Sequence, residues 1–104
     1  MEINEERKVA IVTGGASGIG FAIAEKFVKN NITTIIIGRN EEKLKAAKSK
    51  LGNLCEAISF DLDNLSAIPE FIKSVVEKYS GIDILINNAG INFKKETIYL
   101  IIGL

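Results

Sequence analysis

The chain has 104 residues, with thirteen basic and thirteen acidic residues, no histidine and one cysteine. A net charge of zero without blocks of like charge argues against nucleic acid and anionic membrane as partners. The lack of histidine and the single cysteine exclude a Ser-His-Asp triad, a zinc cluster and an intrachain disulfide. We therefore expect a cytoplasmic protein without signal peptide, membrane span or metal site, in which Cys55 packs as a small apolar side chain.

The first half of the chain alternates between two patterns. Residues 8–13 form a β-branched apolar run that stops at two glycines, which predicts a buried strand and a tight turn. Residues 33–37 repeat the strand pattern, and residues 41–51 predict a helix with acidic residues in its first turn and Gly52 after its end. Between the two strands, from Gly18 to about residue 30, apolar residues recur at helical intervals, at Ile19, Ala22, Ile23, Phe27 and Val28.

The second half repeats this alternation. Residues 54–60 predict a third strand that closes at Asp61, and residues 82–86 predict a fourth that runs into residues 87–90. Between them, residues 65–79 predict a helix, with Pro69 in its opening turns and a glycine after its end. The apolar face expected for this helix comprises Leu65, Ile68, Phe71, Ile72, Val75 and Val76.

Strands that alternate with helices through short links predict an α/β fold, a Rossmann-like doubly wound parallel sheet. The expected strand order is 3-2-1-4, within a single dinucleotide-binding half-domain that comprises residues 1–104. The winding direction reverses between strands one and four, and such folds bind ligands outside the carboxyl ends of these strands. Residues 14–20 and 87–90 both fall there, whereas residues 91–104 are predicted only as an apolar tail.

The segment TGGASGIG, residues 13–20, opens a helix directly after a buried strand. Its free backbone N–H groups and the positive end of the helix dipole would converge on one point, which favours an anion. Gly14 permits the turn, Gly18 lets a phosphate approach the backbone, and Gly20 lets the helix lie close to the sheet. The alternative is a glycine turn that binds no ligand.

Three motifs in order, TGGASGIG at 13–20, Asp61-Leu62 at a strand end and NNAG at 87–90, resemble the short-chain dehydrogenase/reductase family. The resemblance covers residues 8 to about 97 and implies the cofactor-binding part of an NAD(P)-dependent oxidoreductase. By position it implies that the glycine loop binds the cofactor diphosphate, that Asp61-Leu62 contacts adenine, and that NNAG stabilises the central strand beside the cofactor. The residues implied are Ser17, Gly18, Ile19 and Gly20 for the diphosphate, Asp61 and Leu62 for adenine, and Asn88, Ala89 and Gly90.

The polar residues of these motifs also have structural interpretations. Asn87 and Asn88 can bond the backbone at a strand end, a role that can coexist with cofactor contact. Asp61 can cap the helix that follows.

The end of the second strand indicates which dinucleotide is bound. NAD-binding Rossmann sites usually carry a carboxylate there, but this chain has Gly38. Arg39 follows, with a guanidinium suited to a 2′-phosphate, and Asn40 adds a donor. The next residues, Glu41 and Glu42, fall inside the helix. The pattern predicts NADP, with NAD less favoured, and the alternative is an arginine that is merely solvated.

The catalytic pattern that the resemblance implies, a tyrosine with a lysine four residues later, is missing. Tyr79 and Tyr99 are followed at that distance by Asp83 and Gly103, so no lysine is expected to lower the pKa of either phenol at that spacing. We predict no catalytic residue in this chain and no activity alone. Fragment, truncated gene product and free-standing module remain as explanations, and the apolar residues after Thr97 favour truncation.

A function of another class is a self-associating structural or interaction protein. In a truncated sheet the fourth strand would form an open edge, and helix faces that later elements cover would be exposed. We therefore expect a homo-oligomer through this edge and the tail.

Overall fold

Strands and helices alternate along residues 7–88, which are the residues that the computed structural model describes. The elements are β1 (Val9–Thr13), α1 (Gly18–Lys29), β2 (Thr33–Gly38), α2 (Glu41–Leu51), β3 (Cys55–Ser59), the 3-10 turn η1 (Leu65–Ala67), α3 (Ile68–Tyr79) and β4 (Ile84–Asn87). The strands form one parallel sheet in the order β3-β2-β1-β4. The predicted fold class and strand order are confirmed.

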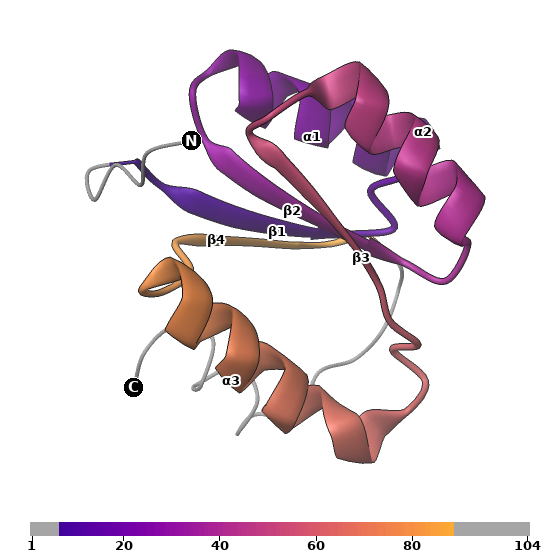
Figure 1. Cartoon of the computed structure of the whole chain (residues 1–104), viewed down its shortest axis with the longest axis vertical. Helices are drawn as coiled ribbons and strands as arrows, with labels where there is room; N and C mark the ends of the chain where they lie inside the picture. Colours follow the sequence, from indigo (N-terminus) through magenta and orange to yellow (C-terminus); the bar gives the residue numbers. More distant parts are fainter. Residues whose placement is uncertain (1–6, 89–104) are drawn as a thin grey trace.

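Helices cover both faces of the sheet, with α1 and α2 on one side and α3 on the other (Figure 1). Side chains of a strand point alternately to the two faces, so Ile35 and Ile37 join the core under α3 while Ile36 joins the core under α1 and α2. This explains why β1 and β2 are buried almost throughout and carry apolar side chains toward both faces, instead of alternating with exposed polar residues. The core under α3 comprises Val9, Ile11, Ile35, Ile37, Leu62, Ile68, Ile72 and Val75. The core under α1 and α2 comprises Val12, Ala24, Ile36, Leu44, Ala47, Leu51 and Cys55.

The cysteine packs in the core, as predicted. Cys55 is 1% exposed, and its backbone carbonyl accepts a hydrogen bond of 2.6 Å from Lys48 Nζ. Burial raises the pKa of the Cys55 thiol to about 11. The side chain therefore stays a neutral thiol at physiological pH and acts as a small apolar group.

Two helices differ from the sequence prediction. Helix α3 begins at Ile68 rather than residue 65, and Leu65 lies in the preceding 3-10 turn, half exposed. Pro69 explains the shift, because proline has no N–H and fits only the first turn of an α-helix. In α1 the fully buried residues are Gly20 and Ala24. Ile19, which its spacing predicts on the apolar face, is 73% exposed.

β4 is an edge strand within residues 7–88, with β1 as its hydrogen-bonded neighbour. Asp83, just before it, accepts from the Val9 N–H through its carboxylate and donates its own N–H to the Val9 carbonyl, both at 2.8 Å. Ala89, Gly90 and the predicted tail at 91–104 lie outside the described residues. Across the described range, no helix is long and apolar enough to cross a membrane, and no group of three metal-ligating side chains gathers.

Candidate dinucleotide-binding site

The predicted site residues follow the carboxyl ends of all four strands. Gly14 follows β1, Arg39 follows β2, Asp61 comes two residues after β3, and Asn88 follows β4. Because the strands are parallel, these positions meet at one edge of the sheet. The fold thus brings together segments that are up to 74 residues apart in the sequence.

The glycine loop between β1 and α1 depends on glycine at several positions for different reasons. Gly14 and Gly18 have φ angles of 67° and 59°, in the left-handed region that side chains disfavour. A Cβ at Gly18 would meet nothing within 4 Å, so the space beside this residue is open. At Gly20, by contrast, a Cβ would clash with the Gly14 carbonyl and lie 2.8 Å from Asn88 Nδ2. The loop therefore combines an open approach to the backbone with close packing of the helix.

The start of α1 lacks the groups that usually neutralise a helix N-terminus. Ser17 is its N-cap residue but makes no side-chain capping hydrogen bond, and the first turn contains no acidic residue. Helix α2 is the opposite case, because Asn40 Oδ1 accepts from the Lys43 N–H at 3.0 Å and two glutamates follow the cap. The N–H groups and dipole of α1 are therefore left for an anion, whereas those of α2 are largely compensated.

The asparagines after β4 connect this strand to the glycine loop. Thr13 Oγ1 donates to Asn87 Oδ1 at 3.1 Å, and Asn88 Nδ2 donates to the Gly14 carbonyl at 3.4 Å. The structural interpretation is confirmed for Asn88, which bonds the backbone, whereas Asn87 accepts a bond from the side chain of Thr13. Contact between Asn88 and a cofactor stays a prediction. The bond to Gly14 uses the side-chain nitrogen of Asn88 and not its side-chain oxygen.

The segment after β3 differs from one of the interpretations made from sequence. Asp61 does not cap the following helix, because its Oδ1 accepts from the N–H of Asp63 at 2.9 Å and holds a tight turn instead. The N-cap positions of η1 and α3 belong to Asn64 and Ala67. Leu62 is buried in the core under α3, so a contact with adenine would have to come from its main chain.

Arg39 is exposed and paired rather than merely solvated. Its Nη1 lies 3.4 Å from Asp63 Oδ2, in an ion pair that sequence reasoning missed. The two residues are 24 positions apart, and only the adjacency of β2 and β3 brings them together. Asn40, the second predicted donor, uses its side-chain oxygen to cap α2.

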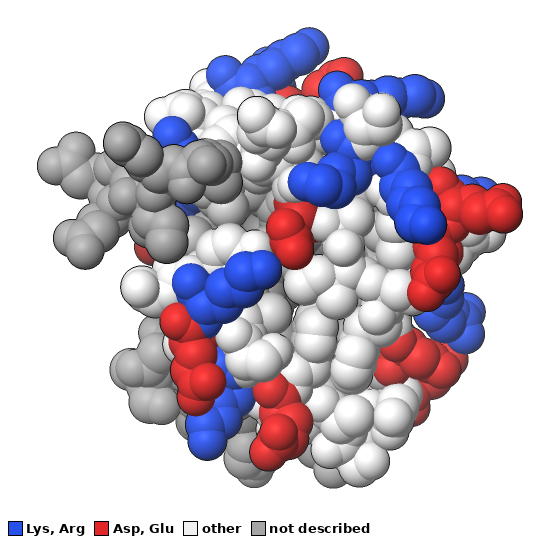
Figure 2. Space-filling view, in the orientation of Figure 1, with Lys and Arg blue, Asp and Glu red and all other residues white. Residues whose placement is uncertain are grey.

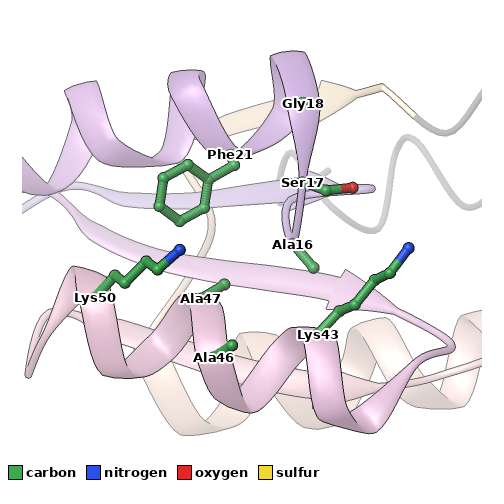
Figure 3. Close-up of a pocket in the computed structure, with 8 residues that line it drawn as sticks. All are labelled: Ala16, Ser17, Gly18, Phe21, Lys43, Ala46, Ala47 and Lys50. Carbon is green, nitrogen blue, oxygen red and sulfur yellow. The ribbon is translucent and has the colours of Figure 1, made fainter.

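A pocket of about 290 Å³ lies between α1 and α2, beside the glycine loop (Figure 3). Of the predicted site residues it contains Ser17 and Gly18, and its floor is mostly apolar. Lys43 extends from α2 toward the loop, which makes it a cation near the site that sequence reasoning missed. The sequence could have indicated this cation, because Lys43 comes three residues after the N-cap Asn40 and so lies in the first turn of α2. The pocket is lined by Ala16, Ser17, Gly18, Phe21, Lys43, Ala46, Ala47 and Lys50.

Charges on the surface are mixed rather than segregated. Figure 2 shows basic and acidic side chains interspersed over the face that it presents. With a net charge of zero, the chain has no strong overall field to attract an anion. Binding of an anion would therefore depend on local groups, the start of α1 and the nearby cations.

Tyr79, the described tyrosine, is far from these groups. It ends α3 near Glu56 at the beginning of β3, at the opposite end of the strands from the glycine loop. A lysine at a different spacing acts on it: Nζ of Lys78, the preceding residue, lies 5.4 Å from the ring centroid and by itself favours a lower pKa of the phenol. Burial opposes Lys78 and is the larger effect, so the pKa of Tyr79 is raised.

Comparison with known proteins gives consistent results for family and fold. Residues 8–100 match the model of the family described as short chain dehydrogenase. An uncharacterized oxidoreductase of Staphylococcus epidermidis is 38% identical over 85 residues, 82% of this chain and 37% of that protein. An NADP-dependent 3-hydroxy acid dehydrogenase of Salmonella typhi is 39% identical over 83 residues, 80% of this chain and 34% of that protein.

A solved structure shares the fold. The crystal structure of a metagenomic short-chain oxidoreductase in complex with NADP superposes with a TM-score of 0.76 at 29% identity, covering 94% of this chain and 50% of that one. The chain thus spans little more than a third of the length of the curated relatives it matches.

Proposed function

We propose that this chain, which belongs to the short chain dehydrogenase family, forms the NADP(H)-binding portion of an oxidoreductase. One observation carries the proposal: the uncapped start of α1, without acidic residues, lies at the sheet edge where Arg39 follows β2. A dinucleotide needs a site for its diphosphate and, if it is NADP, a cation for its 2′-phosphate. The open space beside Gly18 fits the first, and Arg39 fits the second.

Each part of the cofactor has a candidate partner in this chain. In this proposal the helix start holds the diphosphate, Arg39 and the Asn40 amide meet the 2′-phosphate, and the turn after β3 meets adenine. When bound, the nicotinamide coenzyme supplies or accepts the hydride. The residues proposed to contact it are Gly14, Ser17, Gly18, Ile19, Gly20, Arg39, Asn40, Asp61, Leu62, Asn88, Ala89 and Gly90, of which Ala89 and Gly90 lie outside the described residues.

The choice of NADP over NAD is supported by the end of β2. Gly38 stands where NAD-specific sites carry a carboxylate, and Arg39 follows it. The NADP-dependent relative from Salmonella and the metagenomic structure in complex with NADP agree with this choice.

NADP⁺ is expected to bind about ten- to a hundredfold more tightly than NAD⁺, because a charged hydrogen bond from Arg39 contributes about 1.5–3 kcal/mol. Calorimetry with both cofactors measures this, and Arg39→Ala should remove most of the difference. Lys78→Ala is the matched control, since Lys78 is also exposed and paired with a carboxylate at 3.4 Å, but at the far end of the sheet. Equal affinity for the two cofactors, or equal weakening of both by Arg39→Ala, would contradict the assignment.

The state of the cysteine supports a location for the chain. Cys55 is an unpaired, buried thiol. Free thiols persist in reducing compartments, and we place the chain in the cytoplasm on this ground.

A second candidate function, self-association, is favoured by the edge strand. Three β4 side chains, those of Ile84, Leu85 and Ile86, are half-buried, whereas every residue of β1 is buried. An edge strand also presents unpaired backbone groups to a second strand. A homo-oligomer that pairs at β4 would bury these side chains and these backbone groups.

If β4 is an interface, the chain should form dimers or larger species that grow with concentration in size-exclusion chromatography with light scattering. Deletion of residues 98–104, an apolar segment, should lower solubility or shift the oligomer. An unchanged monomer with an unchanged melting temperature would refute this. Association without nucleotide binding would favour a structural role, and binding without association would favour a simple nucleotide-binding module.

A further inference from the structure

The guanidinium that the proposed function assigns to the 2′-phosphate is already in contact with an acid. Arg39 Nη1 lies 3.4 Å from Asp63 Oδ2, and the two side chains are 71% and 68% exposed. Such an exposed pair is weak and opens easily. It nevertheless places a full negative charge beside the cation on which discrimination between the two cofactors would depend.

The backbone on both sides of this pair is fixed. Asp61 holds the N–H of Asp63 at 2.9 Å through its side chain, and its carbonyl accepts from the Asn64 N–H at 3.0 Å. On the other side, Ser59 Oγ donates to the Arg39 carbonyl at 3.4 Å. The two side chains can rotate apart, but their backbones stay close. A phosphate bound by Arg39 would therefore lie near the turn that carries Asp63.

We propose that Asp63 sets the cofactor selectivity of this chain by competing with the 2′-phosphate for Arg39. The inference rests on the proposed function, because it needs Arg39 to meet that phosphate. Asp63 occupies Nη1 of the guanidinium, so a phosphate that binds bidentately through both terminal nitrogens has to displace it. Repulsion between the carboxylate and the doubly charged phosphate acts in the same direction. Asp63 thus lowers the preference for NADP below what Arg39 alone would give.

The test uses the whole chain and two fragments of the cofactor that differ only in the 2′-phosphate. Calorimetry with 2′,5′-ADP and 5′-AMP isolates the contribution of the 2′-phosphate without involving the nicotinamide. We expect Asp63→Asn to raise the affinity for 2′,5′-ADP about three- to tenfold and to leave that for 5′-AMP unchanged. Added salt should reduce this gain, because both charges are exposed. A purely structural role of Asp63 would change the affinity for both fragments alike.

Three further variants separate the causes. Asp63→Glu keeps the charge and should behave like the unmodified chain. Glu56→Gln is the matched control, because Glu56 forms an exposed pair of the same 3.4 Å length with Lys78, away from the site. In an Arg39→Ala background, Asp63→Asn should give less than half of its gain, since the competition is for Arg39.

The outcomes distinguish this inference from the proposed function. If 2′,5′-ADP binds no more tightly than 5′-AMP, the assignment of Arg39 fails and the inference fails with it. If 2′,5′-ADP binds more tightly through Arg39 while Asp63→Asn leaves its affinity unchanged or lowers it, only the inference is overturned. A full gain from Asp63→Asn in the Arg39→Ala background would likewise overturn it.

Discussion

Replacing Gly20 by alanine is expected to lower the free energy of unfolding by about 3 kcal/mol, because the added methyl group has no space. Gly20 is buried in the first turn of α1, and a Cβ there would clash with the Gly14 carbonyl oxygen and crowd Asn88 Nδ2. Relief requires either the glycine loop or α1 to move away from the sheet. For a domain of this size, whose total stability is about 5–15 kcal/mol, the loss is a large fraction.

Urea unfolding followed by circular dichroism measures the effect, and Gly38→Ala is the matched control. A Cβ at Gly38 would lie 3.7 Å from Leu44 Cδ2, an ordinary van der Waals contact. Neither glycine has a positive φ, so the two variants differ in available space rather than in backbone strain. We expect Gly38→Ala to unfold close to the unmodified chain. A Gly20→Ala variant that is equally stable would show that the close approach of α1 to the loop is not required.

The isolated 104-residue chain is expected not to catalyse hydride transfer at a rate typical of complete family members, even when it binds NADPH. A carbonyl substrate must be held near the nicotinamide while a protein group delivers or accepts a proton. Among residues 7–88 the tyrosine is Tyr79, which lies at the opposite end of the sheet from the loop with its pKa raised by burial. Loss of general acid catalysis alone lowers a rate by about 10²–10⁴, and loss of substrate positioning lowers it further.

The measurement is NADPH oxidation, followed by absorbance, with a panel of ketones, aldehydes and quinones. Gly18→Asp serves as the cofactor-site control, because it places a carboxylate where the diphosphate is proposed to bind. Turnover of about one per second that disappears in this variant would contradict the prediction. Self-association would not restore activity, since every copy lacks a tyrosine followed by a lysine four residues later.

The fold could be predicted because its signals are local. Strand β2, with consecutive β-branched residues ending at Gly38, and α2, with an Asn40 cap and Gly52 after its end, have the predicted bounds to within one residue. The start of α3 could not be found from periodicity, because the pattern continues back to Leu65 whereas Pro69 limits where the helix can begin. The exposure of Ile19 could not be predicted either, since helical spacing alone does not say which side of the helix faces the sheet.

The candidate site also has a part that could be predicted from the sequence and a part that could not. The glycine loop was recognisable from its own residues, and its neighbours followed from the order of the strands. The ion pair between Arg39 and Asp63 was not, because it depends on where two loops end after β2 and β3 have paired. Lys43 was assigned only to a helix in the sequence and lines a pocket beside the loop in the structure.

The central position of β1 has a consequence for how this chain folds as it is synthesised. One neighbour of β1, β2, follows about twenty residues later, whereas the bonds between Val9 and Asp83 join residues 74 positions apart. At about 5–20 residues per second, a ribosome needs roughly 4–15 s to make that intervening stretch. During this interval one side of a strand that is fully buried in the finished fold lacks its partner, which exposes the nascent chain to mispairing. Chaperone binding to residues 9–13 would be most useful in that interval and unnecessary once β4 has docked.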